Sequence, residues 1–460
     1  MSELSRIRTV ILPVDARKIG RLRAVPNPGD LLDELEIELD EDSEDGQSLR
    51  QAAEQLRSSH IPVSFPTETV YGLGADATRS AAVQGIYKAK QRPSDNPLIV
   101  HFASLAQLRA VLRSQKHTAT CANGHVEYHP HSDPIPDIYK PLIERFWPGP
   151  LTIILPNPPN SPLAPEVTAG LSTFGARIPR HAIALALITL ADVPVAAPSA
   201  NASTKPSPTA AEHVAYDLDG RIETIIDGGP CDVGVESTVV DGLSRPPLVL
   251  RPGGISIEQL QSCPGWENTE IGYKNAAEGD SQPRAPGMKY RHYSPKAPVV
   301  LFEAGREPPT AAELRRYTGP NARLGIVRTR SWKLDPENHS SPIRPLTETE
   351  QTNAEEAHDQ AQSSTPGFAG LLEIIESTRE PRKALQKCVI QQEGQPITLL
   401  DICLGPHTAG IARGIFAALR ELDREDVDAI LVEGIDDAEG VTAAAIMNRL
   451  RKAAEIRVGG

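Results

Sequence analysis

The sequence is poor in aromatic residues, in cysteine and in long apolar runs. Aromatic residues make up 4% of the 460 residues, and there are only five cysteines, which are scattered and form no C-x-x-C pair. An odd number of scattered cysteines argues against a disulfide scaffold and against a zinc ribbon, and it is typical of a reducing compartment.

Membrane and secretion signals are also absent from the sequence. The longest apolar run, 182–191, is much shorter than the roughly 18 residues that a membrane span needs. The N-terminal segment lacks the apolar core of a signal peptide. We therefore expect a cytoplasmic protein without a membrane partner.

Several common catalytic signatures are missing as well. The chain contains no G-x-x-x-x-G-K-[ST], no G-x-G-x-x-G, no H-E-x-x-H and no G-x-S-x-G. A nucleotide would therefore have to be bound without a P-loop, and neither zinc-protease nor serine-hydrolase chemistry is indicated.

Negative charge is concentrated in one segment. The formal net charge is −13, but residues 30–45 hold ten acidic residues and no basic one, which leaves −3 for the remainder. Blocks of like charge repel and rarely pack, so we interpret residues 1–46 as an acidic variable leader, solvated and mobile, with one strand at 9–12. A partner-binding tail is the alternative interpretation of the acidic run.

The length predicts two domains. Strand and helix patterns alternate over 47–261, which predicts an α/β catalytic domain with a surface insertion at 114–137. Residues 262–297 form a polar linker. Residues 298–460 alternate again and predict a smaller Rossmann-like parallel α/β domain, in which 331–365 is expected to be disordered.

Apolar periodicity and capping residues place the individual elements. Helices are expected at 49–56, 105–112, 138–146, 182–190, 209–217, 409–422 and 441–454, and another that Asp76 caps and that ends at Lys90. Strands are expected at 61–65, 97–102, 151–155, 173–178, 193–197, 224–226, 237–240, 248–250, 299–302, 323–327, 397–403 and 429–432.

The first polar cluster is FPTETVYGLG at 65–74. Thr67, Glu68 and Thr69 place two hydroxyls and a carboxylate at the end of a strand, where α/β folds usually bind ligands. The two glycines permit close approach of the backbone. A tight strand-to-helix turn without a ligand is the alternative interpretation.

The second cluster combines cations with a histidine. Lys88, Lys90 and Arg92 gather at a helix C-terminus, where the helix dipole alone favours them. Arg92 can also form a bidentate contact with phosphate oxygens, and Lys90 can act as a point charge beside them. His101 in the next strand is either a ligand or an ordinary core histidine.

Further hydroxyls and arginines follow or interrupt buried strands. They occur in five short segments, TFGARIPRH at 173–181, AAPSANA at 196–202, PSPT at 206–209, EST at 236–238 and RPGG at 251–254. None of these segments forms a recognisable catalytic triad.

Taken in order, the segments PTETVYGLG, K-x-RPSDNPLIVH, FWPGPLT, AAPSAN and ESTVVD resemble the YrdC-type domain of the L-threonylcarbamoyladenylate synthase family. The resemblance runs from about Pro62 to Gly254. PGMKYRHYSP at 286–295 is similar to the linker of longer members that carry a C-terminal Rossmann-like domain. The expected fold is therefore α/β, a twisted mixed sheet with helices plus the smaller Rossmann-like domain.

The resemblance also implies roles for individual residues. Residues expected to bind L-threonine are Thr69, His101, Arg177, Ala197 and Ser237. Residues expected to bind ATP are Arg92, Asn96, Thr173, Ser199, Ser207, Arg251 and His292. Lys90 and Arg92 are the expected catalytic residues at the phosphates, and His292 would make the linker a lid.

The implied reaction joins L-threonine, bicarbonate and ATP to threonylcarbamoyl-AMP and pyrophosphate, with Mg²⁺ accompanying ATP. The product would pass to a tRNA threonylcarbamoyl transferase complex for the modification of adenosine 37. A hydrogenase-maturation carbamoyltransferase would add paired C-x-x-C motifs, which are absent. A YrdC-type RNA-binding module without synthase activity is the remaining alternative. Weak contact of the synthase with RNA is also an expectation.

Overall fold

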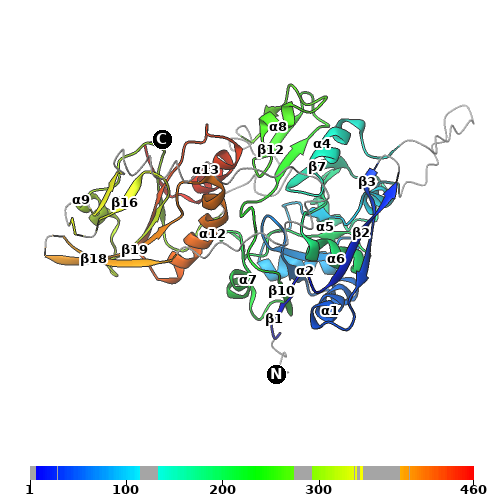
Figure 1. Cartoon of the computed structure of the whole chain (residues 1–460), viewed down its shortest axis with the longest axis horizontal. Coiled ribbons are helices and arrows are strands. Elements are labelled where there is room, and N and C mark those ends of the chain that lie inside the picture. Colours follow the sequence, from blue (N-terminus) through cyan, green and yellow to red (C-terminus); the bar gives the residue numbers. More distant parts are fainter. Residues whose placement is uncertain are drawn as a thin grey trace, which may run out of the picture. The chain divides into compact units, whose positions relative to one another are not determined.

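The structure is a computed structural model. It describes residues 7–27, 30–113, 133–273, 293–335, 337–338, 342–345, 384–392 and 394–459. The chain forms two compact units, coloured along the sequence in Figure 1. The N-terminal unit comprises Met1–Ala202, Ala210–Cys231 and Glu236–Lys289, and the C-terminal unit comprises Ser203–Thr209, Asp232–Val235 and Tyr290–Gly460.

A mixed β-sheet forms the centre of the N-terminal unit. Within the described residues it has eleven strands in the order β1-β10-β4-β5-β9-β6-β8-β7-β11-β12-β13. The strands are β1 (Val10–Pro13), β4 (Val63–Phe65), β5 (Gly72–Asp76), β6 (Ile99–His101), β7 (Leu151–Pro156), β8 (Thr173–Arg177), β9 (Val195–Ala196), β10 (Thr224–Asp227), β11 (Thr238–Asp241), β12 (Leu248–Arg251) and β13 (Glu270–Ile271).

Helices cover this sheet, and most of them were expected from the sequence. They are α1 (Glu44–Ser58), α2 (Ser80–Lys90), α3 (Leu105–Arg113), α4 (Lys140–Phe146), α5 (Pro165–Thr168), α6 (Ala182–Ala191), α7 (Ala211–Leu218) and α8 (Ile257–Gln261), with a 3₁₀ turn at Asp137–Tyr139. Helix α6 is apolar on all sides, and it is buried accordingly, since Ile183–Ile188 are all buried.

The acidic run is partly packed, which was not expected, although Glu34, Glu36 and Glu38 are exposed as predicted for a solvated segment. It forms β3 (Asp30–Leu39), which pairs antiparallel with β2 (Gly20–Asn27). Leu35 is buried, and Asp33 pairs with Arg109 of α3. The alternation of acids with Leu35 and Ile37 gives the strand one apolar face, which outweighs the repulsion between its acids.

Two local predictions around the first motif are also corrected. The chain after Phe65 turns into strand β5 and not into a helix, and β5 pairs antiparallel with β4. Asp76 ends β5, and the N-cap position of α2 is Arg79. The Asp76 carboxylate instead accepts hydrogen bonds from the backbone and hydroxyl of Thr78.

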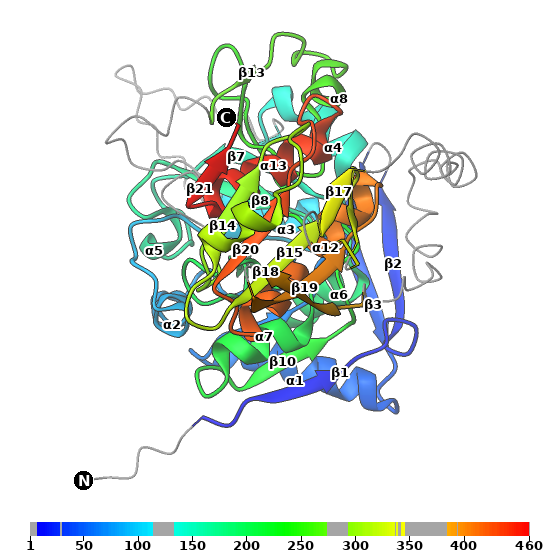
Figure 2. The same cartoon turned by 90° about the vertical axis from the view of Figure 1, so that its left-hand side faces the viewer.

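The C-terminal unit contains the expected parallel sheet. Its order is β18-β19-β15-β20-β14-β21, and all neighbours are parallel except the β18–β19 pair (Figure 2). The strands are β14 (Val299–Phe302), β15 (Arg323–Arg328), β18 (Gln386–Gln392), β19 (Gln395–Cys403), β20 (Ala429–Glu433) and β21 (Ile456–Val458).

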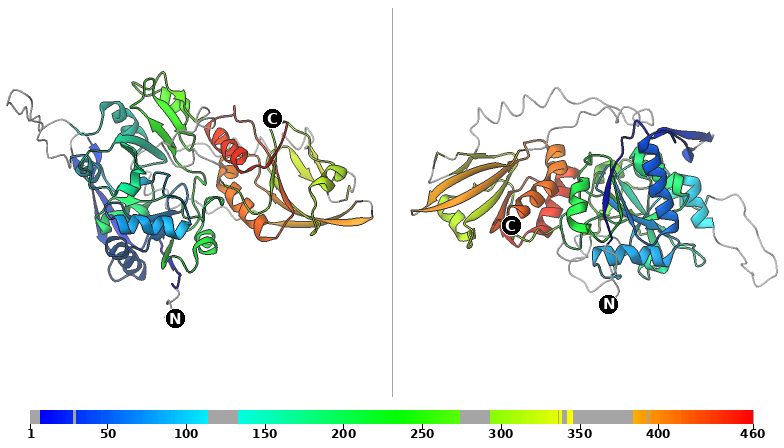
Figure 3. Two further views of the ribbon diagram at one scale, coloured as in Figure 1. Left: turned by 180° about the vertical axis from the view of Figure 1, so that it is seen from behind. Right: turned by 90° about the horizontal axis from the view of Figure 1, so that it is seen from below.

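Helices α12 (Thr408–Arg424) and α13 (Val441–Ala453) lie together on one face of this sheet (Figure 3). A second apolar cluster includes α9 (Ala311–Leu314), which a 3₁₀ turn at Arg315–Tyr317 follows. Part of the segment expected to be disordered is ordered, because β16 (Trp332–Leu334) and β17 (Ile343–Pro345) form a ribbon that buries Trp332. Within the described residues, no helix is both long and apolar enough to cross a membrane.

Candidate functional site

Five neighbouring strands place polar side chains in one row across the N-terminal sheet. His101 ends β6, and it stands opposite Arg177, which ends β8. On the adjoining strand β7, the Thr152 hydroxyl lies 2.8 Å from the Ser237 hydroxyl, at the start of β11. Arg251, at the end of β12, donates to the Ser237 hydroxyl at 3.0 Å. The order of the strands in the sheet therefore brings these residues together, although His101 and Arg251 lie 150 positions apart in the sequence.

Arg177 is the electrostatic centre of the row. Its guanidinium lies 2.7 Å from the Glu68 carboxylate and donates to the Thr69 hydroxyl at 3.0 Å and to the Gly149 carbonyl at 3.2 Å. The Arg177 and Glu68 side chains are 5% and 1% exposed. The additional hydrogen bonds are made by Arg177, whereas both carboxylate oxygens of Glu68 are buried and have no hydrogen-bond partner among the described residues, so the buried pair retains acceptor capacity.

The turn after β4 orients two of these groups. The Thr67 hydroxyl donates to the Val70 carbonyl at 2.7 Å and accepts from the backbone amides of Thr69 and Val70. This arrangement closes the turn and places Glu68 and Thr69 beside Arg177. Thr67 therefore supports the turn, whereas Thr69 belongs to the polar row.

Both histidines near Arg177 are neutral at physiological pH. Burial lowers the pKa of His101 to about 3, and the Arg177 charge acts in the same direction. Burial also lowers the pKa of His181 to about 4, although the Glu68 carboxylate opposes the shift. Nδ1 of each ring is buried and has no hydrogen-bond partner among the described residues. Each neutral ring therefore retains unsatisfied hydrogen-bonding capacity in the site.

Lys90 is buried rather than displayed at the helix end. It is 2% exposed, and its ammonium donates to the Asn201 carbonyl at 2.6 Å and to the Ser199 carbonyl. The Ser199 hydroxyl donates to Oδ1 of Asn201 at 2.5 Å. Lys90 thus fixes the loop that carries Ser199, which complementation of the helix dipole alone does not explain.

Arg92 and Asn96 lie on the loop that follows α2. The Arg92 amide bonds the Tyr87 carbonyl at 3.1 Å, and the Tyr87 hydroxyl lies 3.0 Å from the Asn96 carbonyl. Burial raises the pKa of Tyr87 to about 12, whereas the charge of Arg92 lowers it. Oδ1 of Asn96 is buried and has no hydrogen-bond partner among the described residues.

Thr173 is farther from Arg177 along β8, and Ala197 directly follows β9. Thr173 begins β8 opposite Pro156, four residues before Arg177, which corresponds to about 13 Å along a strand. Ala197 is buried, and its amide bonds the Ile99 carbonyl at 2.9 Å. These two residues therefore extend the site beyond the Arg177 cluster.

The last two predicted residues are Ser207 and His292. Ser207 is 1% exposed and belongs to the Ser203–Thr209 segment of the C-terminal unit. His292, predicted to cover the nucleotide, lies outside the described residues.

The structure adds three residues to the predicted set, and it gives Glu68 of the first polar cluster a partner. Glu68, Thr152, His181 and Asn201 contact or electrostatically influence its members. Thr152, His181 and Asn201 stand in the segments FWPGPLT, TFGARIPRH and AAPSANA, and Glu68 in FPTETVYGLG. Their presence in those segments was the available signal, but their pairing with strands elsewhere was not visible in the sequence.

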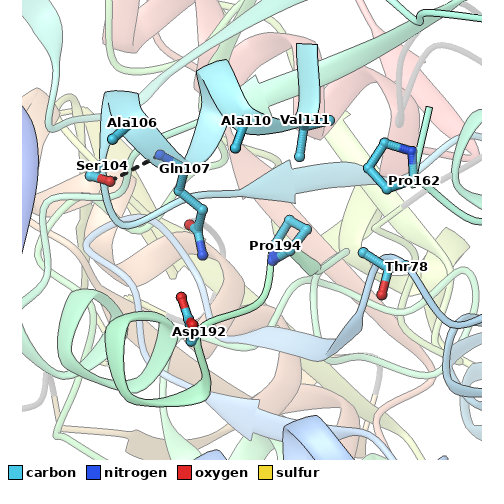
Figure 4. A pocket seen from close by; sticks show the side chains of 9 residues that line it. All are labelled: Thr78, Ser104, Ala106, Gln107, Ala110, Val111, Pro162, Asp192 and Pro194. Carbon is cyan, nitrogen blue, oxygen red and sulfur yellow. Dashed lines mark hydrogen bonds between the residues drawn. The ribbon is translucent and has the colours of Figure 1, made fainter. Parts of the chain in front are cut away.

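A separate cavity of about 400 Å³ opens beside α3 (Figure 4). Its lining residues are Thr78, Ser104, Ala106, Gln107, Ala110, Val111, Pro162, Asp192 and Pro194. None of them belongs to the polar row, and Asp192 is the only charged residue in the lining. The cavity therefore offers no group suited to the predicted chemistry.

No group of three or more His, Cys, Asp or Glu side chains is placed to hold a metal ion in the part of the chain that the structure describes. The carboxylate of the polar row, that of Glu68, is already paired with Arg177.

Comparisons with known proteins cover almost the whole chain. A family model described as "Telomere recombination" matches residues 55–253, and one described as "Threonylcarbamoyl-AMP synthase, C-terminal domain" matches 255–455. The chain is 44% identical to a threonylcarbamoyl-AMP synthase of Schizosaccharomyces pombe, over 90% of both chains. It is 40% identical to that of Bacillus subtilis, over 91% of this chain and 96% of the relative. Among solved structures, Pyrococcus abyssi Sua5 complexed with L-threonine matches with a TM-score of 0.64 and 33% identity, over 98% of this chain and 100% of that chain.

Proposed function

Because this chain belongs to the threonylcarbamoyl-AMP synthase family, we propose that it converts L-threonine, bicarbonate and ATP to threonylcarbamoyl-AMP and pyrophosphate. The observation that carries this proposal is the buried polar row centred on Arg177 and Glu68, within a chain that matches its relatives over nearly their full length.

The proposed threonine subsite is the Arg177 end of the row. A zwitterion needs one cationic and one anionic partner, and Arg177 and Glu68 provide both within 2.7 Å of each other. The Thr69 and Ser237 hydroxyls are already oriented by hydrogen bonds, so they can pair with a substrate hydroxyl without large rearrangement. Neutral His101 adds a polar nitrogen, and Ala197 supplies a small neighbour.

The proposed nucleotide subsite uses the loops around α2 and β12. Arg92, Asn96, Ser199 and Arg251 would contact ATP, together with Thr173, Ser207 and His292. Lys90 fixes the Ser199 loop and adds positive charge beside it. A guanidinium and an ammonium suit phosphate oxygens, because both offer several charged donors. The distance of about 13 Å between Thr173 and Arg177 suits an elongated product such as threonylcarbamoyl-AMP.

The proposed reaction needs no side-chain nucleophile. The threonine amine adds to CO₂ with loss of a proton, or to bicarbonate with loss of water, to give an N-carboxylate. An oxygen of this carboxylate attacks the α-phosphorus of ATP and expels pyrophosphate. The residues of the row orient the two anionic reactants and stabilise the charge that grows on the leaving phosphates. Mg²⁺ would accompany the ATP phosphates.

Four further statements about the enzyme are also proposals. The enzyme acts as a nucleotidyltransferase in the cytoplasm, and it passes its product to a tRNA threonylcarbamoyl transferase complex. The mixed anhydride of threonylcarbamoyl-AMP is prone to hydrolysis, which favours direct transfer to the next enzyme. Weak contact with RNA would assist this transfer.

The test is pyrophosphate release from ATP by the purified full chain, measured with threonine and bicarbonate omitted in turn. We expect release only when both are present, together with threonylcarbamoyl-AMP identified by mass spectrometry. Release that does not depend on threonine would refute the proposal. Salt-dependent RNA binding without any turnover would favour the RNA-binding alternative.

A further inference from the structure

One stripe of helix α12 contacts three segments that lie far away in the sequence. Residues at positions 412, 416, 420 and 423 are spaced by four, four and three, so they lie along one side of the helix. The three segments are Ser203–Thr209, Asp232–Val235 and the end of the linker from Tyr293 to Ala297. All three belong to the C-terminal unit, although the first two interrupt the N-terminal unit in sequence.

The first segment is tied to α12 through Arg420. This side chain is 4% exposed, and its Nη2 donates to the carbonyl of Pro206. The Thr204 carbonyl accepts from the Ser294 amide at 2.8 Å, and Thr204 has φ +73°, which a residue other than glycine seldom adopts. These contacts hold the loop in an uncommon backbone conformation at Thr204. Ser207 of the same loop is buried.

The backbone of the second segment lies directly against the backbone of α12 at Gly234. Gly234 has φ +78°, and a Cβ atom there would lie 2.4 Å from both the Ala412 carbonyl oxygen and the Arg413 Cα. The next residue, Val235, is fully buried in the same apolar cluster as α12. The chain leaves this contact directly into Glu236 and Ser237.

The third segment is the end of the linker. The Tyr293 ring stacks on Phe416 with centroids 5.3 Å apart, and the Arg449 guanidinium lies 5.9 Å from the Tyr293 ring. The Asp423 carboxylate accepts from the Lys296 amide at 2.7 Å and from the Ala297 amide at 2.9 Å. The same stripe of α12 therefore holds the linker end as well as both loops.

We propose that helix α12 is the template that sets the conformation of two substrate loops, with Arg420 as the positioning residue of the loop that carries Ser207. The proposal rests on the proposed function, in which Ser207 contacts ATP and Ser237 contacts L-threonine. It gives the C-terminal unit a part in substrate binding through loops of the catalytic sequence, rather than through a ligand site of its own.

The two contacts on α12 can be broken separately. Arg420→Met removes the donor to Pro206, and we expect it to raise the KM for ATP about tenfold while the KM for threonine stays unchanged. Arg420→Lys keeps a charged donor and should recover part of the ATP affinity. Arg424→Met, at an exposed position in the last turn of the same helix, is the matched control. Gly234→Ala displaces the other loop, and it should raise the KM for threonine by a comparable factor and spare ATP.

Amide hydrogen exchange provides a readout that is independent of turnover. Exchange within 203–209 should be faster in Arg420→Met than in the wild type or in Arg424→Met. If Arg420→Met does not fold, Gly234→Ala still tests the template. Folded variants with unchanged exchange and unchanged KM values, or with an equal rise of both KM values, would overturn the inference. An inactive wild-type enzyme would refute the proposed function instead, and the exchange experiment would still decide the role of α12.

Discussion

The Glu68–Arg177 pair allows stability and activity to be separated. Glu68→Gln leaves the Arg177 guanidinium buried with neutral partners only, namely the Thr69 hydroxyl, the Gly149 carbonyl and the new amide. Removing one member of a buried ion pair costs about 3–5 kcal/mol, and we expect the lower end because glutamine can still accept a hydrogen bond. In a unit of this size, that cost lowers the melting temperature by about 6–12 °C.

The double variant Glu68→Gln/Arg177→Met supplies the decisive measurement. Once both charges are absent, no unpaired charge remains buried, so the double variant should be more stable than the sum of the single effects predicts by about 2 kcal/mol or more. Threonine binding should nevertheless stay lost, because the guanidinium is part of the proposed substrate subsite. Stability is recovered in this design and activity is not.

The assay is thermal unfolding of the full chain, with amide exchange of β6 and β8 to report the local effect. Glu38→Gln is the matched control, since Glu38 and Arg23 lie 3.7 Å apart with 67% and 65% of their side chains exposed. Such an exposed pair contributes little, so its melting temperature should change by no more than about 2 °C. Additive effects of the two single variants would refute the reasoning, because they would show that Glu68 and Arg177 are not coupled.

Three further predictions concern the proposed site. Arg92→Ala should lower turnover by about 100-fold by removing charge at the phosphates, whereas Lys88→Ala should not, because Lys88 is exposed on α2. The kcat/KM for 2-aminobutyrate should fall about 10²- to 10⁴-fold below that for threonine, and equal values would exclude hydroxyl recognition by Thr69 and Ser237. His101 has a folded pKa of about 3 against 6.5 unfolded, so the unfolded state takes up the proton first as pH falls. The contribution of neutral His101 to the free energy of unfolding is therefore intact above pH 6.5 and decreases between pH 6.5 and 3. The melting temperature of His101→Gln should be less sensitive to pH in that window than the melting temperature of the wild type.

The sequence alone determined the class of fold and most of the elements. Apolar alternation identified strands such as β8 and β19, and apolar helical runs identified α6 and α12, because burial of side chains follows the period of the backbone. The predictions were wrong where local signals conflicted with pairing. The acidic run became β3 because its alternating leucine and isoleucine residues form an apolar face, and the residues after Phe65 became β5 because β4 and β9 accept them as a strand.

The order of the strands could be decided only by the tertiary structure. Motifs such as ESTVVD and TFGARIPRH mark polar residues on buried strands, but no spacing along the chain shows that Thr152 meets Ser237 or that Glu68 pairs with Arg177. The sequence places Pro206 and Gly234 within the catalytic segment, whereas in the structure both contact α12, more than 170 residues later. Long-range packing selects these contacts, since the same local pattern of residues is compatible with many strand orders and only one of them buries this set of side chains together.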